Sequence, residues 1–251
     1  MRRPIIAGNW KMYKTPAQAK ALAHEIRAGL DQAVLSEREV VLCPPFVDLT
    51  AVEEAIRGSG VGLGAQNFYP KAEGAFTGEI SAPMLKELGV TYVIIGHSER
   101  RQYFREDDDF VNQKVLAALK NGLKPILCIG ERLDEMEANL TEKRIEAQLI
   151  GGLKDVSPEG LASLVVAYEP VWAIGTGKNA TPQQAQDVHC FIRGWVAAKF
   201  GKELAENLRI QYGGSVKAEN AVSLLTQPDI DGALIGGASL SAGSFLSIVK
   251  Y

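Results

Sequence analysis

The sequence has 251 residues, 46% of them hydrophobic and 23% charged, and its formal net charge at pH 7 is −3. This profile is typical of a globular protein with a large core, and without a composition shift or linker we expect one domain spanning residues 1–251. The nearly neutral charge, with no run of like charge and no basic patch interleaved with aromatics, argues against nucleic acid or a membrane surface as a partner.

The start of the chain and the cysteines indicate the compartment. Only three successive apolar residues, Ile5 to Ala7, occur near the N-terminus, too few for the core of a signal peptide, and no later stretch approaches a membrane span. Cys43, Cys128 and Cys190 are widely spaced and contain no C-x-x-C pair, which argues against a disulfide framework or a zinc site. We therefore expect a cytoplasmic protein with reduced thiols.

Short apolar runs recur along the chain, and helix start signals such as Thr15-Pro16 and Ser157-Pro158 lie between them. This alternation predicts an α/β fold with a parallel sheet. A doubly wound sheet is an alternative, but eight units in about 250 residues favour a single-domain closed (βα)8 barrel. The runs are Ile5–Ala7, Val40–Cys43, Val61–Ala65, Tyr92–Ile95, Pro125–Ile129, Leu164–Tyr168, Ile210–Tyr212 and Ala233–Ile235.

Active sites of such barrels lie at the carboxyl ends of the strands, so the residues that follow each run are candidates for function. They are chemically varied. The candidates are Asn9 and Lys11, Pro44 and Pro45, Gln66 and Asn67, His97 and Ser98, Glu131, Glu169, Gly213 to Ser215, and Gly236 with Gly237.

Lys11 and His97 follow the first and fourth runs. A lone lysine at a strand end is usually a solvated charge, but one that converges with an anion site would attract an anionic substrate, with Asn9 as a neutral donor beside it. His97 precedes a predicted helix capped by Ser98, and a helix N-terminus favours a neutral imidazole that can donate a hydrogen bond. A structural histidine at a turn is the alternative. His24 and His189 lie within helical patterns, where we expect structural roles.

Glu169 stands at the end of the sixth run, where Pro170 turns the chain out of the sheet. The residues from Trp172 to Gly177 combine apolar bulk with glycine freedom, which describes a lid, and the next helix opens with a capping box at Thr181. A solvated glutamate beside a rim tryptophan is the plain alternative. The length of the connection favours a functional loop.

Glycines follow the last strands. Gly213-Gly214-Ser215 and Gly236-Gly237 come after the seventh and eighth runs, where barrels commonly hold phosphate, and Gly175 follows the sixth. Each pair alone is more often a tight turn. Three scattered histidines offer no metal-ligand spacing, and no lysine lies within the runs for a Schiff base. A carboxylate base, a neutral electrophile and a cation remain, which suit proton transfer next to a carbonyl.

Six motifs, in order along the whole chain, resemble those of the triosephosphate isomerase family. They are A-G-N-W-K, G-A-F-T-G-E-I-S, I-I-G-H-S-E-R-R, A-Y-E-P-V-W-A-I-G-T-G-K, Y-G-G-S-V and I-G-G-A-S-L. The resemblance implies an eight-stranded barrel that interconverts dihydroxyacetone phosphate and glyceraldehyde 3-phosphate through an enediol, without cofactor or metal. It implies these roles: Glu169 as base, His97 as electrophile, Asn9 and Lys11 on the substrate, Gly175, Ser215, Gly236 and Gly237 on the phosphate, and Glu99 and Cys128 beside the site.

The same resemblance implies a homodimer. The long loop from Gln66 to Ala82 contains Phe68, Tyr69 and Phe76, which would be costly to expose, and in the family this loop inserts into a second subunit. Thr77 would then reach the neighbour's Asn9 and Lys11. A loop folded over its own barrel is the alternative.

Departures from the family pattern are peripheral. Met136 and Asn139 stand where Arg and Gly are common, and residues Pro70 to Glu73 fall in a variable part of the third loop. Two other functions are alternatives. A sugar-phosphate epimerase on the same barrel would use another acid/base set, commonly with a metal, and a phosphometabolite-binding protein would not need intact Lys11, His97 and Glu169.

Overall fold

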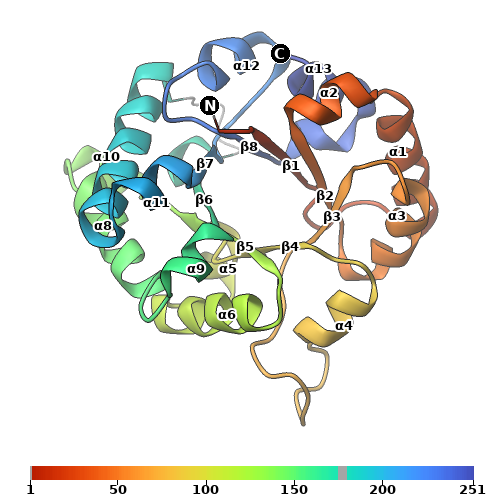
Figure 1. Cartoon of the computed structure of the whole chain (residues 1–251), viewed down its shortest axis with the longest axis horizontal. Helices are drawn as coiled ribbons and strands as arrows, with labels where there is room; N and C mark the ends of the chain where they lie inside the picture. The colour runs from red at the N-terminus through yellow and green to blue at the C-terminus, as the bar shows by residue number, and fades with distance from the viewer. Residues whose placement is uncertain (1, 175–179) are drawn as a thin grey trace.

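The computed structural model describes residues 2–174 and 180–251, and its strands form a closed parallel barrel in sequence order. Helices surround the barrel (Figure 1). All eight predicted strands are confirmed within one or two residues. The strands are β1 (Ile5–Asn9), β2 (Glu39–Cys43), β3 (Gly62–Ala65), β4 (Tyr92–Ile95), β5 (Lys124–Ile129), β6 (Val165–Tyr168), β7 (Arg209–Tyr212) and β8 (Gly232–Ile235).

The barrel closes where β8 pairs with β1, with Ile5 opposite Gly232 and Gly8 opposite Ile235. The chains approach so closely here that a Cβ atom on Gly232 would lie 2.0 Å from the carbonyl oxygen of Ile5. Gly232 also has φ +127°, a conformation that favours glycine. The last strand can therefore start at this point only with a residue that lacks a side chain.

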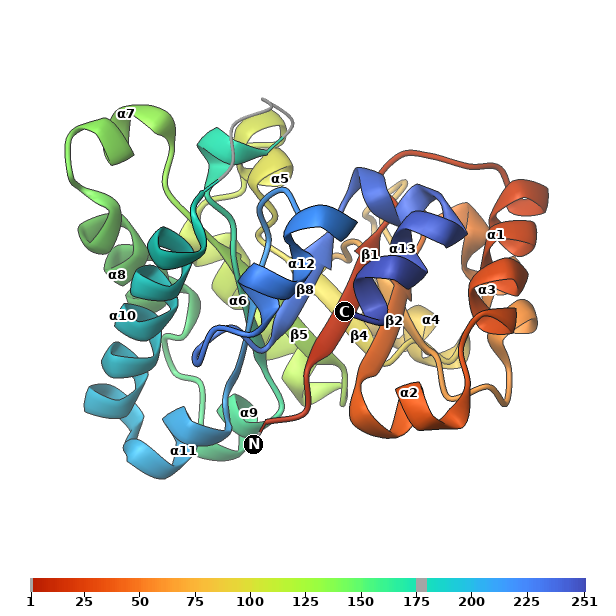
Figure 2. The ribbon, with the colours of Figure 1, turned by 90° about the horizontal axis from the view of Figure 1, so that it is seen from above.

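The helices occupy the connections between strands, and the ends of the barrel carry different ones. In Figure 2, α5 and α7 lie at one end and α9 and α11 at the other. The helices are α1 (Pro16–Ala28), α2 (Gln32–Glu37), α3 (Leu49–Ile56), α4 (Ala82–Glu87), α5 (Ser98–Tyr103), α6 (Asp108–Lys120), α7 (Leu133–Glu137), α8 (Thr141–Gly152), α9 (Pro158–Ala162), α10 (Pro182–Phe200), α11 (Lys202–Asn207), α12 (Ala218–Leu225) and α13 (Ala242–Val249); short 3-10 turns are η1 (Phe46–Asp48), η2 (Val171–Ala173) and η3 (Gly237–Leu240).

The predicted helix starts are present. The backbone N–H of Thr181 donates to the Gln184 side chain at 2.9 Å, and the backbone N–H of Gln184 donates to Thr181 Oγ1 at 3.1 Å, a reciprocal capping box. At the start of α9, Ser157 Oγ accepts from the backbone N–H of Gly160. The starts of α9 and α10 are thus fixed by local hydrogen bonds as well as by packing.

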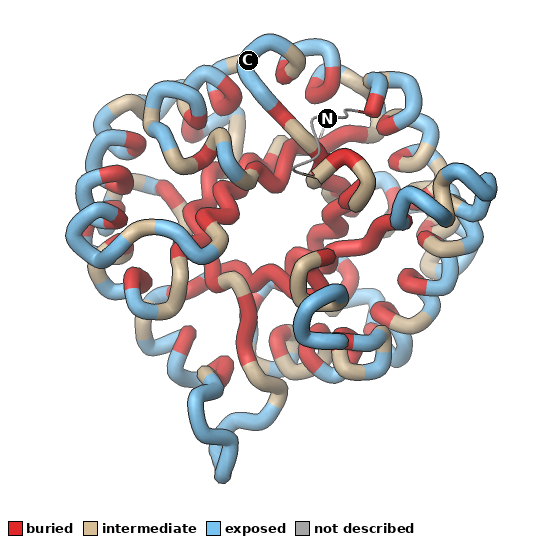
Figure 3. Tube along the Cα trace, turned by 180° about the vertical axis from the view of Figure 1, so that it is seen from behind, coloured by how far each residue is buried: buried red, intermediate tan, exposed pale blue. Residues whose placement is uncertain are grey.

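The core has two layers, one inside the barrel and one between the barrel and its helices. Figure 3 shows the buried residues following the strands. Side chains alternate along each strand, so Ala167 belongs to the inner layer and Tyr168 to the outer one. By the same alternation Glu169 turns back toward the barrel axis. The sequence therefore places this carboxylate at the mouth of the barrel.

The loop between β3 and α4 projects from the barrel (Figure 1). Its two arms meet at an isolated bridge between Tyr69 and Ser81, and the rings of Tyr69 and Phe76 stack with centroids 4.4 Å apart. Phe76 is 38% exposed, but Phe68 is only 1% exposed and packs in the core of its own chain. Of Phe68, Tyr69 and Phe76, Phe68 is therefore already buried without a second subunit. Among the described residues, no helix is both long and apolar enough to span a membrane.

Candidate active site

A cavity of about 680 Å³ opens at the carboxyl ends of the strands. It gathers most of the site residues predicted from the sequence, which come from β1, β4, β6, β7 and β8 or the loops after them. Gly175 lies outside the described residues, as does the predicted lid beyond Ile174. The predicted residues that line the cavity are Asn9, Lys11, His97, Glu169, Gly213, Gly214, Ser215, Gly236 and Gly237.

Some candidates lie elsewhere. Pro45, Gln66, Asn67 and Glu99 line a smaller neighbouring cavity of about 300 Å³, which also touches the catalytic candidates Asn9, Lys11 and His97. The larger cavity extends further than the sequence indicated, because it continues along the starts of α12 and α13. The lining residues that sequence reasoning missed are Val216 to Glu219, Leu234, Ala238, Gly243, Ser244 and Ser247.

Glu169 is held by two donors from the β4 exit. Its Oε1 atom lies 3.0 Å from Nε2 of His97, and its Oε2 atom accepts the backbone N–H of Ser98 at 2.9 Å. Burial raises the pKa of Glu169, but the electrostatic attraction and hydrogen bond of His97, the bond from Ser98 N–H and the charge of Lys11 more than offset this, so the pKa falls below its usual value. The carboxylate is therefore ionised and ready to accept a proton.

His97, and not Ser98 as predicted, is the N-cap of α5. Its backbone is non-helical, and its Nδ1 atom accepts the backbone N–H of Glu99 at 3.2 Å. The helix begins one residue earlier than predicted because the His97 imidazole accepts the second helical N–H, that of Glu99. The N–H of Ser98 is then available to Glu169. An Nδ1 atom that accepts carries no hydrogen, so the remaining one sits on Nε2, facing Glu169.

Two influences act on the charge of His97. Burial lowers the pKa of His97. The carboxylates of Glu169 and Glu99 raise it by more, so the pKa lies above its usual value. The hydrogen bond to Nδ1 opposes protonation, because an imidazolium would turn a second donor toward the Glu99 N–H. This geometry therefore favours the neutral imidazole of His97 with its hydrogen on Nε2.

Lys11 is fixed in position by both its backbone and its side chain. It has φ +52°, unusual for a residue with a side chain. Its backbone N–H donates to Asn9 Oδ1 at 3.0 Å, and its carbonyl accepts from Gln66 Nε2 at 2.8 Å. Its ammonium pairs with Glu99 at 2.6 Å. Glu99 thus acts on the main cavity through Lys11.

Glu131 does not line the cavity with Glu169. Its Oε1 atom accepts hydrogen bonds from Trp172 Nε1 at 2.7 Å and from the hydroxyl of Tyr168 at 3.0 Å. Its backbone carbonyl accepts from the N–H of Val171. Burial raises the pKa of Glu131. Glu131 therefore holds the turn that leaves Glu169, and no polarity signal in the sequence distinguished this role from a catalytic one.

Glycines leave space around Glu169. A Cβ atom on Gly130 would lie 1.7 Å from the carbonyl oxygen of Glu169, and one on Gly213 would lie 2.8 Å from its Cγ. A Cβ on Gly237 would meet no atom within 4 Å. Gly130 and Gly213 are thus needed for the approach of neighbouring strands, whereas Gly237 leaves open space on the cavity side.

The fold and this cavity define a (βα)8-barrel enzyme with its titratable groups at the carboxyl ends of the strands. Comparison with known proteins narrows the class. The sequence model of the family described as triosephosphate isomerase matches residues 4–251, and the chain belongs to this family.

Relatives named triosephosphate isomerase are similar over their full length. Those of Chloroflexus aurantiacus and Caldanaerobacter subterraneus subsp. tengcongensis are each 56% identical over 251 residues, covering 100% of both chains. That of Carboxydothermus hydrogenoformans is 54% identical over 250 residues, covering 100% of this chain and 99% of the relative. In residues 2–174 and 180–251, no group of three or more His, Cys, Asp or Glu side chains could hold a metal ion.

Proposed function

We propose that this chain is a cytoplasmic, single-domain isomerase that interconverts dihydroxyacetone phosphate and glyceraldehyde 3-phosphate. The observation that carries the proposal is the buried contact between Glu169 and His97 at the mouth of the barrel, with Lys11 on the same cavity. Family membership supplies the substrate class. The geometry of the cavity and the family resemblance support the residue roles proposed below.

Glu169 is the base. It removes a proton from the hydroxyl-bearing carbon beside the carbonyl; the electron pair of that C–H bond forms the C=C bond, and the π pair of the carbonyl moves onto its oxygen. As the enediol collapses, the neighbouring hydroxyl gives its proton to that oxygen and becomes the new carbonyl, while the carboxyl group returns a proton to the former carbonyl carbon. To do so, the carboxylate must leave the donors His97 and Ser98. The Nε2–H of His97 is then released and can donate to the substrate oxygen on which negative charge develops.

Lys11 supplies a positive charge in this cavity beside the proposed base. Its ammonium attracts the phosphorylated triose and stabilises the enediolate, with Asn9 as a neutral donor beside it. Glu99 holds the ammonium in place through the 2.6 Å ion pair. The phosphate is assigned to Ser215, Gly236 and Gly237, and Gly175 is assigned with them on the resemblance alone.

We also propose that the chain forms a homodimer through the loop from Gln66 to Ala82. The smaller cavity carries strongly exposed apolar residues, since Met12, Tyr103 and Phe104 are 93%, 68% and 65% exposed. Because Asn9, Lys11 and His97 line the same cavity, a loop tip of a second copy seated there would brace them. The loop that projects from this chain presents Phe76 and Thr77 for that purpose.

Asp48 is a buried carboxylate in the segment after β2. It is buried beside Val47, which is 74% exposed, and neither of its carboxylate oxygens has a hydrogen-bond partner among the residues that the structure describes. Burial raises the pKa of Asp48. An unpaired buried carboxylate costs stability, and because Asp48 is completely buried within its own chain this cost is the same with or without a second copy.

A coupled isomerase assay without added metal tests the reaction. Turnover of either triose phosphate supports the proposal, and activity that appears only after metal addition would favour a different barrel enzyme. For the dimer, Phe76→Glu with Thr77→Lys should give monomers with much reduced turnover, measured by sedimentation and activity on one sample. Ile150→Glu, on the exposed face of α8, is the matched control. A fully active monomer would refute the coupling, and an unchanged dimer would refute the interface.

A further inference from the structure

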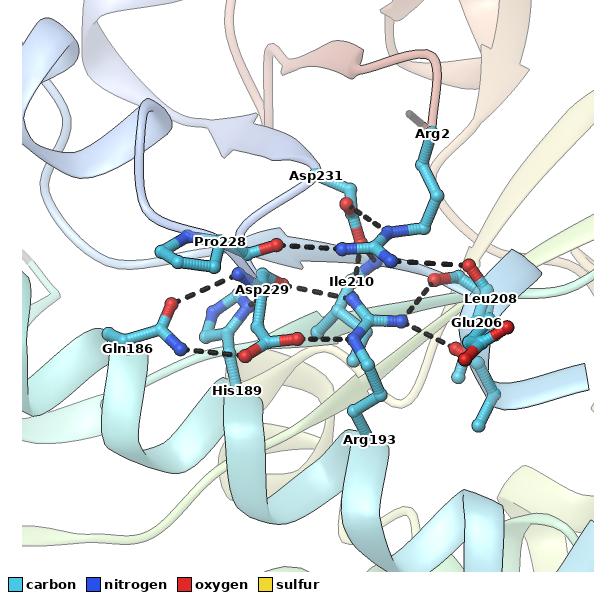
Figure 4. Close-up of polar contacts among 11 residues, drawn as sticks. Arg2, Gln186, His189, Arg193, Glu206, Leu208, Ile210, Pro228, Asp229 and Asp231 are labelled. Atoms are coloured by element: carbon cyan, nitrogen blue, oxygen red, sulfur yellow. Dashed lines mark hydrogen bonds and ion pairs between the residues drawn. The ribbon is translucent and has the colours of Figure 1, made fainter. Parts of the chain in front are cut away.

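His189 on α10 is completely buried, although no step of the proposed reaction uses it. Its Nδ1 atom lies 3.2 Å from the backbone carbonyl oxygen of Asp229 (Figure 4). A carbonyl only accepts, so Nδ1 carries the hydrogen. Burial lowers the pKa of His189 to about 3, so the ring stays neutral at physiological pH.

The carbonyl that holds His189 is itself fixed. Asp229 pairs through its carboxylate with Arg193 Nε at 2.5 Å and accepts from Gln186 Nε2 at 2.7 Å. Its backbone N–H donates to Gln186 Oε1 at 3.0 Å. Arg193 also pairs with Asp231, which Arg2 contacts from the other side (Figure 4). One edge of the imidazole is therefore tied to the segment that leads into β8.

The rest of the ring packs on two tyrosines of the barrel wall. The Tyr168 ring meets it edge-on, with centroids 5.8 Å apart and planes at 84°, and the Tyr212 ring lies 6.4 Å away. The two tyrosine rings are also 6.4 Å from each other. The three rings thus form a closed triangle between α10 and the last residues of β6 and β7.

Each tyrosine directly precedes part of the site. Tyr168 comes before Glu169, and its hydroxyl donates to the Glu131 carboxylate that also accepts from Trp172. Tyr212 comes before Gly213, and its hydroxyl oxygen would lie 2.3 Å from a Cβ atom on Gly214. A rotation of either ring would displace the base or the glycines of the cavity.

We propose that His189 is a positioning residue for the reaction: tied to Asp229 on one side, its ring sets the orientation of Tyr168 and Tyr212, and through them the placement of Glu169 and Gly213. This inference rests on the proposed function. Misplacement of reacting groups by about 1 Å can cost on the order of 10²-fold in rate, so the effect belongs in kcat.

The test separates the ring from its hydrogen bond. His189→Leu removes both, His189→Phe keeps an aromatic ring without the donor, and His189→Gln keeps a donor without the ring. We expect His189→Leu to lower kcat about tenfold or more with KM within about twofold, and His189→Phe to recover part of the loss. His24→Leu, on an exposed position of α1, is the control and should match the wild type.

An NMR readout does not depend on turnover. The chain has three tryptophans, and Trp172→Phe identifies the indole N–H resonance that reports the bond to Glu131. That resonance should shift in His189→Leu and stay in place in His24→Leu. Loss of thermal stability alone, with kcat and the resonance unchanged, would overturn the inference.

Failure to fold is covered by the other two variants. If His189→Leu does not fold, unchanged kcat and an unchanged Trp172 resonance in both His189→Phe and His189→Gln would also overturn the inference. A wild-type chain without isomerase activity would instead refute the proposed function, and the resonance would still report whether His189 orders the turn after Glu169.

Discussion

Nε2 of His97 lies 3.0 Å from Oε1 of Glu169, and the two residues are only 6% and 2% exposed. The proposed base and the proposed electrophile therefore contact each other in the absence of substrate. Their contact keeps the carboxylate ionised in a buried place, and the one hydrogen of the imidazole, on Nε2, faces Glu169. Substrate must replace this contact, and several expectations depend on it.

Glu169→Gln should fold normally and keep its affinity for inorganic phosphate, while kcat falls about 10²- to 10⁴-fold, because an amide cannot accept the proton. The amide oxygen can still accept from one of the two donors, His97 Nε2–H or Ser98 N–H, and the side chain keeps its volume, although its NH2 group then faces the other donor. Steady-state kinetics and phosphate inhibition measure both effects. Glu25→Gln on exposed α1 is the control. Turnover near that of the wild type in the folded variant would remove Glu169 from its role.

His97 should be neutral at physiological pH, with hydrogen on Nε2, as a helix N-terminus requires and as the bond from Glu99 N–H to Nδ1 indicates. Nitrogen-15 NMR distinguishes the two ring nitrogens. Since the Glu169 carboxylate raises the pKa of His97, Glu169→Gln should lower that pKa. An ordinary titration near neutrality in the wild type would show that the carboxylates outweigh the bond to Nδ1.

Gly237→Ala should raise KM for the triose phosphates with little change in the free energy of unfolding. The added methyl group meets no protein atom within 4 Å, so it fills only the space assigned to the phosphate. Gly194→Ala, in the exposed interior of α10, is the control: it should stabilise by about 0.5–1 kcal/mol and leave KM unchanged. An unchanged KM in Gly237→Ala would place the phosphate elsewhere.

Lys114 on α6 is 1% exposed and joins the loop after β3 to the segment after α5. Its Nζ atom lies 2.5 Å from Glu106 Oε1 and 2.7 Å from Asn67 Oδ1. Lys114→Met should cost about 3–5 kcal/mol of unfolding free energy, because Glu106 is left buried with reduced compensation. Urea unfolding measures the loss. Adding Glu106→Leu to Lys114→Met should recover much of it, and failure to do so would mean that packing, not charge, dominates.

Sequence reasoning found the strands because buried parallel strands are continuous apolar runs, as in β4 (Tyr92–Ile95). It also found the start of α10, because Thr181, Pro182 and Gln184 form a local signal. The candidates Lys11, His97 and Glu169 converge because a closed barrel brings all its carboxyl ends to one face.

Other features depend on contacts between distant segments, which no local pattern displays. His97 caps α5 although histidine is not a usual N-cap residue, and Lys114 is buried although lysine is normally exposed. Gln66 was singled out only by its place after a strand. Its hydrogen bonds to the carbonyls of Lys11 and Cys43 required the folded loops.

Gly130 has no group that reacts, yet the backbone of Glu169 passes through the place where a side chain at 130 would begin. A comparison of sequences that considers only the acid, the base and the cation would miss Gly130. A homologous chain with Glu, His and Lys intact but alanine at 130 would have every reagent and no room to place the carboxylate. Such a chain would be classified as an isomerase and would be inert, because of one added methyl group.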